Sequence, residues 1–184
     1  VKMYLRQMGQ IPLLTRDQEL TLAKRIEADE LAYREGVLRL PIIRRDLLRL
    51  SDLLIEGELS PEDYSKDDPN LKREELVAQL IELRKKLRKA HSKTKVRKII
   101  DQYHLTIQAI EWLVEQVVRY VRGVENAERQ IALTKKAKGK GRNTKLQMLA
   151  KKRQEQQRLL GGPVEKMRAA LRDIYLKEAA YTKS

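Results

Sequence analysis

The chain has 184 residues, of which 41% are hydrophobic, 36% charged and 4% aromatic, with no phenylalanine. So few aromatic side chains argue against an aromatic-rich β-sandwich, and the many Lys, Arg, Glu, Gln, Leu and Ala residues are typical of long helices with one solvated face. Composition therefore predicts an all-α fold of extended amphipathic helices, packed as an antiparallel helical bundle.

The charge balance points to a polyanionic partner. Forty Lys and Arg residues against 26 Asp and Glu residues leave a net charge of +14. Such an excess favours nucleic acid, with a merely solubilising surface as the alternative. The absence of cysteine excludes disulfides and thiolate metal sites and fits a cytoplasmic protein. No apolar run reaches the roughly 18 residues of a membrane span, so we expect no membrane partner.

The first 56 residues predict three helices. Val1 to Met8 forms a short amphipathic segment that Gly9 and a following proline end. Thr15 and Gln18 then make a capping box at the start of a longer helix. Two apolar stripes follow, one on each side of Pro41, and their residues are Leu22, Ile26, Tyr33, Val37 and Leu40, then Ile43, Leu47, Leu50 and Leu54.

Residues 57–70 form the predicted internal boundary, with a turn at Asp67–Asn70, and they separate segments 1–56 and 57–184. The helical period returns at residues 71–90. A second apolar seam, from Tyr103 to Val124, alternates spacings of four and three as in coiled coils. We expect the helix that carries this seam to pack antiparallel against the 71–90 helix.

A run from Lys135 to Arg153 contains nine basic residues and no acidic one. Because released counterions favour phosphate binding without sequence readout, the run predicts nonspecific phosphate contacts, and a solvated loop tip is an equally good interpretation. The residues assigned to these contacts are Lys135, Lys136, Lys138, Lys140 and Arg142. Gly161 to Pro163 then break the chain before a last amphipathic helix, which carries Val164, Met167, Leu171 and Ile174.

No pattern in the sequence indicates a catalytic centre. There is no cysteine, and the two histidines, His91 and His104, are thirteen residues apart, about 20 Å on one continuous helix. No glycine-rich loop follows a predicted strand. We therefore expect a non-enzyme with no metal and no cofactor. The aromatic residues Trp112, Tyr33, Tyr103 and Tyr175 are interpreted as packing residues rather than base-stacking ones.

The opening stretch resembles a known family. Residues Val1 to Glu27 read V-K-M-Y-L-R-Q-M-G-Q-I-P-L-L-T-R-D-Q-E-L-T-L-A-K-R-I-E. They resemble region 1.2 of bacterial primary (sigma-70 type) sigma factors, approximately D-P-V-R-x-Y-L-R-E-M-G followed by L-L-T-x-x-x-E-x-x-L-A-K-R-I-E. The leading D-P and the E-A-N-L-R-L-V start of region 2.1 are missing. The resemblance thus implies a fragment, with region 1.2 within residues 1–56 and the helical non-conserved insert at 57–184.

In this family, region 1.2 contacts the single-stranded non-template strand of the promoter discriminator and supports region 2. Carried over by position, the contacting residues are Lys2, Tyr4, Leu5 and Arg6, with Lys2 and Leu5 standing where the family often has Arg and Met. Lys2 and Arg6, four residues apart, place two cations on one helix face, and Tyr4 offers a stacking surface. Burial of Tyr4, Leu5 and Met8 against the next helix is the alternative.

The resemblance also implies promoter DNA and the RNA polymerase core, through its clamp, as partners. A competing interpretation is a structural helical adaptor for protein interactions, with no DNA contact. In that case the basic run would serve solubility and the first helix would be buried.

Overall fold

The computed structural model describes residues 14–66, 72–137 and 141–183, and its regular elements are all helices. In chain order they are α2 (Arg16–Leu38), α3 (Ile43–Glu56), α4 (Pro61–Tyr64), α5 (Arg73–Lys89), α6 (Lys93–Asp101), α7 (Ile107–Lys136), α8 (Arg142–Leu160) and α9 (Val164–Lys183). The all-α prediction is confirmed for this part of the chain. The predicted turn at Asp67–Asn70 lies outside it.

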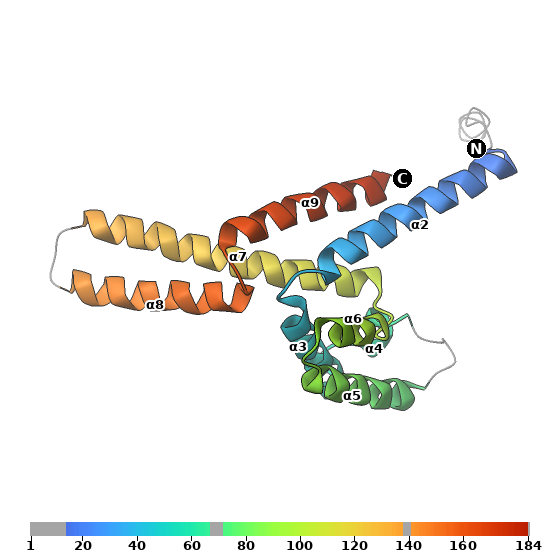
Figure 1. Ribbon diagram of the computed structural model, residues 1–184, viewed down its shortest axis with the longest axis horizontal. Helices are drawn as coiled ribbons and strands as arrows, with labels where there is room; N and C mark the ends of the chain where they lie inside the picture. Colours follow the sequence, from blue (N-terminus) through green and yellow to red (C-terminus); the bar gives the residue numbers. More distant parts are fainter. Residues whose placement is uncertain (1–13, 67–71, 138–140, 184) are drawn as a thin grey trace, which may run out of the picture.

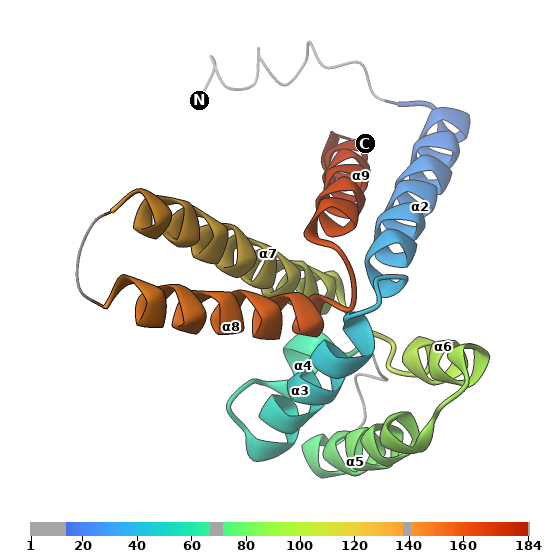
Figure 2. The same cartoon turned by 60° about the vertical axis from the view of Figure 1, so that its left-hand side comes forward.

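The helices form three groups that meet at a shared centre. α7 and α8 make a long antiparallel hairpin, α2 and α9 lie side by side and antiparallel, and α3 to α6 form a cluster of shorter helices (Figure 1). The view in Figure 2 shows the same three groups pointing away from one another.

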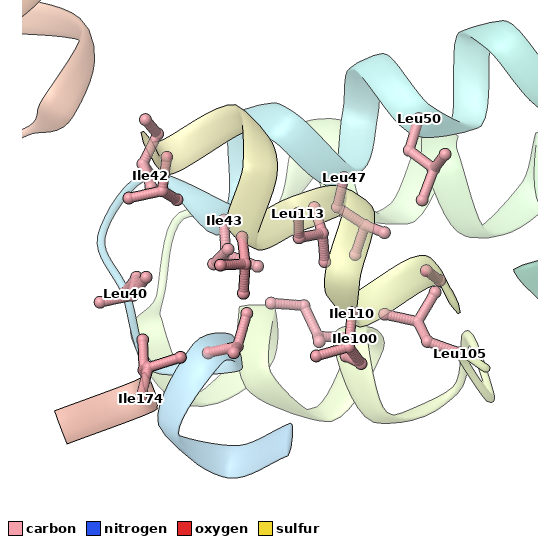
Figure 3. Close-up of a cluster of buried hydrophobic side chains, with 14 of the residues drawn as sticks. Leu40, Ile42, Ile43, Leu47, Leu50, Ile100, Leu105, Ile110, Leu113 and Ile174 are labelled. Carbon is pink, nitrogen blue, oxygen red and sulfur yellow. The ribbon is translucent and has the colours of Figure 1, made fainter. Parts of the chain in front are cut away.

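The core lies where the three groups meet. Its largest fully buried side chains are Tyr33 and Tyr103, together with leucines and isoleucines of α3, α5, α7, α8 and α9. Figure 3 shows part of this cluster. The residues labelled in Figure 3 are Leu40, Ile42, Ile43, Leu47, Leu50, Ile100, Leu105, Ile110, Leu113 and Ile174. Residues on both sides of positions 57–70 contribute side chains to one core, so this core joins all three groups of helices. The division into segments 1–56 and 57–184 stays a prediction.

Two turns meet at the centre. Leu40 and Pro41 connect α2 to α3, and Gly161 ends α8 with a left-handed φ of 72°. A Cβ atom on Gly161 would lie 3.3 Å from Cβ of Pro41, so the two turns are in close contact. Glycine is required at this position because its conformation is unfavourable for other residues and its neighbour leaves little room.

Arginines on α3 fasten the ends of two other helices. Arg44 Nη2 donates to the carbonyl of Leu87 at 3.1 Å, near the end of α5. Arg45 Nη1 donates to the carbonyl of Leu159 at 2.9 Å, near the end of α8. The last carbonyls of a helix lack partners within it and carry partial negative charge, so cationic donors there are favourable.

A short backbone ladder ties α4 to the segment before α7. The amide of Lys66 donates to the carbonyl of His104 at 2.6 Å, and the amide of Thr106 donates to that of Tyr64 at 3.1 Å. His104 has a φ of 41°, which is unusual for a residue with a side chain. The chain therefore reverses between α6 and α7.

That reversal explains one wrong prediction. The helix carrying the 103–124 seam does not pack along residues 71–90: α7 lies along α8, whereas α5 packs on α3. Tyr103 precedes the helix and is buried beside Ser51, whose hydroxyl lies 3.2 Å from the tyrosine hydroxyl. The apolar spacing correctly indicated a buried face, but the same spacing fits any helix that offers a complementary groove.

Candidate nucleic-acid interface

The four residues assigned to DNA contact, Lys2, Tyr4, Leu5 and Arg6, lie outside the described residues, as does the predicted helix Val1–Met8. The structure instead shows the element to which that segment is joined. Leu14 and Thr15 lead directly into α2, which is the described helix nearest to that segment in the sequence.

The start of α2 is capped as predicted. The amide of Thr15 donates to Oε1 of Gln18 at 2.9 Å, and the amide of Gln18 donates to Oγ1 of Thr15 at 3.3 Å. Asp17 and Glu19 lie in the first turn, where negative charge is favourable. Two otherwise unpaired amides are thereby satisfied, and the direction of the chain at the helix start is fixed.

The outer half of α2 is exposed and its charge is mixed. Residues 16–30 carry three basic and five acidic side chains, whereas residues 1–15 carry two basic ones and no acidic one. Leu20 and Leu31 are 55% and 58% exposed, and Leu22 and Ile26 are half-buried. By charge, residues 16–30 are therefore not a phosphate-binding surface, and the excess of basic over acidic side chains lies in residues 1–15 of the sequence.

The inner half of α2 is held by α9. Tyr33 is buried and stacks on Tyr181, with ring centroids 6.5 Å apart and planes 10° from parallel. One turn further, Gly36 lies against the side chains of Lys177 and Ile174. α9 thus positions the helix that follows the predicted DNA-contacting segment.

The second predicted contact area is at the tip of the α7–α8 hairpin. Lys135 and Lys136 end α7 and Arg142 begins α8, and all three are exposed. Lys138 and Lys140 lie outside the described residues. Further along the basic run, Nε of Arg153 pairs with Glu128 at 2.8 Å, so this arginine is used within the hairpin.

The two areas lie far apart. The hairpin tip and the start of α2 are at opposite ends of the molecule in Figure 1, and Figure 2 agrees. The structure therefore does not combine the basic run and the first helix of the described fold into one surface. A single short DNA strand would meet one or the other.

Three of the four aromatic residues that were interpreted as packing residues lie in or against the core. Trp112 is half-buried against the core, and Tyr33 and Tyr103 are buried. Tyr175 is the exception, because it is 46% exposed and lines an open trench rather than the core.

None of the helices, within the part of the chain that the structure describes, is long and apolar enough to cross a membrane.

Sequence reasoning missed the arginines that bind distant carbonyl groups. Arg34 Nη2 donates to the carbonyl of Leu105, which joins α2 to the segment before α7. Arg44 and Arg45 do the same from α3. Arg34 sits next to Tyr33 of the apolar stripe, and Arg44 and Arg45 sit directly after Ile43. Cations so close to buried positions were the available signal that these charges are structural.

A comparison with protein families names the class. Residues 1–32 match the family model for sigma-70 factor, region 1.2, which ends within α2. This segment is therefore similar to region 1.2 of sigma-70 type sigma factors, a family of non-enzymatic transcription initiation factors.

Proposed function

We propose that the chain is part of a sigma factor for bacterial transcription initiation, in which residues 1–6 contact the non-template strand of the promoter discriminator and region 1.2 supports region 2. The observation that carries this proposal is the region 1.2 match over residues 1–32. Lys2, Tyr4, Leu5 and Arg6 are the contacting residues, and the opening fifteen residues hold two cations without a carboxylate.

The described helices would support this contact. α9 holds α2 through the Tyr33–Tyr181 stack, and the capping box of Thr15 and Gln18 fixes the start of α2. Helices α4 to α9 lie within residues 57–184, the helical insert, which would face RNA polymerase or a regulator. Contact with the polymerase clamp is part of this proposal.

The test is the lifetime of open complexes formed by the full-length parent factor with RNA polymerase. On promoters with a guanine-rich discriminator, Arg6→Ala is expected to shorten this lifetime about tenfold, because a forked arginine–guanine contact discriminates by about 1–3 kcal/mol. The control is Arg172→Ala, an exposed arginine on α9. An unchanged lifetime with Arg6→Ala would remove this residue from the DNA contacts.

The tip of the hairpin would add nonspecific attraction for phosphate. Fluorescence anisotropy with a duplex of random sequence tests it by the dependence of the association constant on salt. Replacing Lys135, Lys136 and Arg142 by glutamine should lower the slope of that dependence by up to about three. Lys151→Gln with Lys152→Gln is the control on α8 away from the tip. Equal slopes for both variants would favour a solvated tip.

A helical adaptor without DNA contact is the second candidate. It is favoured by the exposed leucines of the α2–α9 pair, where Leu20, Leu31 and Leu176 are 55%, 58% and 72% exposed. Anisotropy with a single-stranded discriminator oligonucleotide separates the candidates. Salt-sensitive binding that is lost on substitution of Tyr4 and Arg6 supports DNA contact. Binding that survives these substitutions points to the basic run of the hairpin.

A further inference from the structure

A trench lies between α7 and α9, and Tyr33 of α2 is among the residues that line it. Its volume is about 820 Å³, and it lies beside the centre where the three groups of helices meet. One wall is formed by α7 from Glu111 to Asn126, and the opposite wall by Tyr175 and Glu178 of α9. This trench is called the α7–α9 trench below.

The end of the trench at Tyr33 has the chemistry of a cation-binding site. The Tyr33 side chain is 1% exposed, and its hydroxyl oxygen has no hydrogen-bond partner among the described residues. Burial, together with the nearby carboxylates of Glu178 and Glu111, raises the pKa of this hydroxyl above its usual range. The oxygen is therefore a neutral acceptor held near two carboxylates, and a buried acceptor of this kind is costly unless a donor reaches it.

The charges along the trench are separated rather than paired. Glu111, Glu115 and Glu178 line the part near Tyr33, and Arg119 and Arg122 line the part that follows along α7. Within the described residues, none of these five side chains takes part in an ion pair. Elsewhere the fold pairs charges readily, as at Glu125 with Arg168 and Glu128 with Arg153.

The far end of the trench also offers amide groups. Asn126 lines it, and Oε1 of Gln156 is buried without a hydrogen-bond partner in the described fold. Gln156 packs so closely on Gly123 that a Cβ atom there would lie 2.4 Å from Oε1. The absence of a side chain at Gly123 lets this amide reach the floor of the trench.

We propose that the α7–α9 trench binds an extended segment of a partner protein that carries a lysine or arginine and, four or five residues away, a carboxylate. The cationic group would lie between Tyr33 and Glu178, with the ring of Tyr175 beside it, and the carboxylate would lie over Arg119 and Arg122. A polyamine fits less well, because its far end would meet the two arginines.

The spacing follows from helix geometry. Glu111 and Arg119 are eight residues apart on α7, and Glu111 and Arg122 eleven, which correspond to about 12 and 16 Å at 1.5 Å per residue. An extended chain advances about 3.3 Å per residue, so four or five residues cover that distance. The partner segment needs no regular structure before it binds.

The test uses the full chain and an end-blocked, fluorescein-labelled hexapeptide with arginine second, glutamate sixth, and serine and glycine between. Fluorescence anisotropy should show saturable binding that weakens with salt. Replacing the peptide arginine by uncharged citrulline should weaken it about tenfold, as should Glu178→Gln. Glu165→Gln, an exposed carboxylate on the same helix, is the matched control and should leave binding unchanged.

A charge exchange sharpens the test. Glu178→Lys should abolish binding of the original peptide and should restore binding of a peptide with glutamate in the second position. Tyr33→Phe removes the hydroxyl and keeps the ring, and should weaken the arginine peptide. Equal effects of Glu178→Gln and Glu165→Gln would overturn the proposal. The proposal would also be overturned if spermidine competed as well as the peptide and Arg122→Gln did not weaken binding. The occupant would then be a free polyamine.

Discussion

The guanidinium carbon of Arg45 lies 4.5 Å from the centre of the Tyr120 ring. The same guanidinium donates to the carboxylate of the fully buried Asp46 at 2.8 Å and to the carbonyl of Leu159 at 2.9 Å. One side chain on α3 therefore contacts α7 through a ring and α8 through its last turn. The hairpin is joined to the centre of the molecule by this cation.

We predict that Arg45→Ala lowers the free energy of unfolding by about 2 kcal/mol or more. The substitution removes a charged hydrogen bond and leaves the buried carboxylate of Asp46 without its cation. Arg45→Lys should lower the free energy of unfolding by less, because lysine keeps the positive charge and lacks only the paired N–H donors of the guanidinium group. Urea denaturation measures both, with Arg172→Ala as the exposed control. A value for Arg45→Ala within about 0.5 kcal/mol of the unchanged protein would contradict the prediction.

Asp46 should make stability depend on pH in an unusual direction. Burial raises the pKa of this carboxyl above its usual 3.8, against the lowering effect of Arg45. The folded protein then holds the proton to higher pH than the unfolded chain does. Protonation of Asp46 therefore stabilises the folded state fully below pH 3.8, and this stabilisation is lost as pH rises through the raised pKa of the folded state.

Asp46→Asn removes this titration. Relative to the unchanged protein, the variant should therefore gain stability as pH rises from about 3.5 to 7, which urea denaturation at several pH values would show. The absolute difference at one pH also contains the altered hydrogen bonds to Arg45, so the trend with pH is the measurement that decides. A relative stability that is constant or falls with pH would refute the raised pKa.

Two left-handed glycines provide a matched comparison. Gly57 has a φ of 79°, and a Cβ atom there would meet its nearest neighbour at 3.9 Å. Gly161 has a φ of 72°, and its Cβ atom would approach Pro41 to 3.3 Å. Gly57→Ala should cost about 1–2 kcal/mol from backbone conformation alone, and Gly161→Ala should cost more. Thermal unfolding tests the order, and equal costs would show that the contact with Pro41 adjusts freely.

The stack between α2 and α9 can be measured with a double-mutant cycle. Tyr33→Leu and Tyr181→Leu should each destabilise the protein, and the coupling between them should be about 0.5–1.5 kcal/mol in favour of the native pair. Additive effects would mean that the two rings contribute through burial alone. Hydrogen exchange of α9 amides gives an independent readout, because the outer turns should open more often in Tyr181→Leu.

Much of the helical pattern could be predicted from the sequence. The capping box at Thr15 and the break at Gly161 to Pro163 are confirmed where they were expected, and α3 ends at Gly57, the first residue of the predicted boundary 57–70. These signals are local, since they depend on backbone conformation and on side chains three or four residues apart. The inner part of the first stripe, at Tyr33 and Val37, is buried as predicted, and Leu22 further out is half-buried.

The partners of the helices could not be predicted in the same way. α7 has an apolar face along most of its length, and that face is shared among the central core, α9 and α8 rather than covered by residues 71–90. Which helix covers it depends on the reversal at His104 and on the arginine contacts to distant carbonyls, for which short-range periodicity carries no signal. The separation of charges in the α7–α9 trench could not be predicted from the sequence either, because it depends on which helices lie side by side.

The contact between Pro41 and Gly161 has a consequence for how this architecture tolerates change in length. The chain leaves the end of α2 and returns to the start of α9 at nearly the same point, after it has formed α3 to α8. Helices α3 to α8 are thus an insertion between the two paired helices α2 and α9. Lengthening or shortening the outer turns of the α7–α8 hairpin would leave the α2–α9 pair unchanged, so the length of such an insertion can vary between related proteins while the pair keeps its geometry.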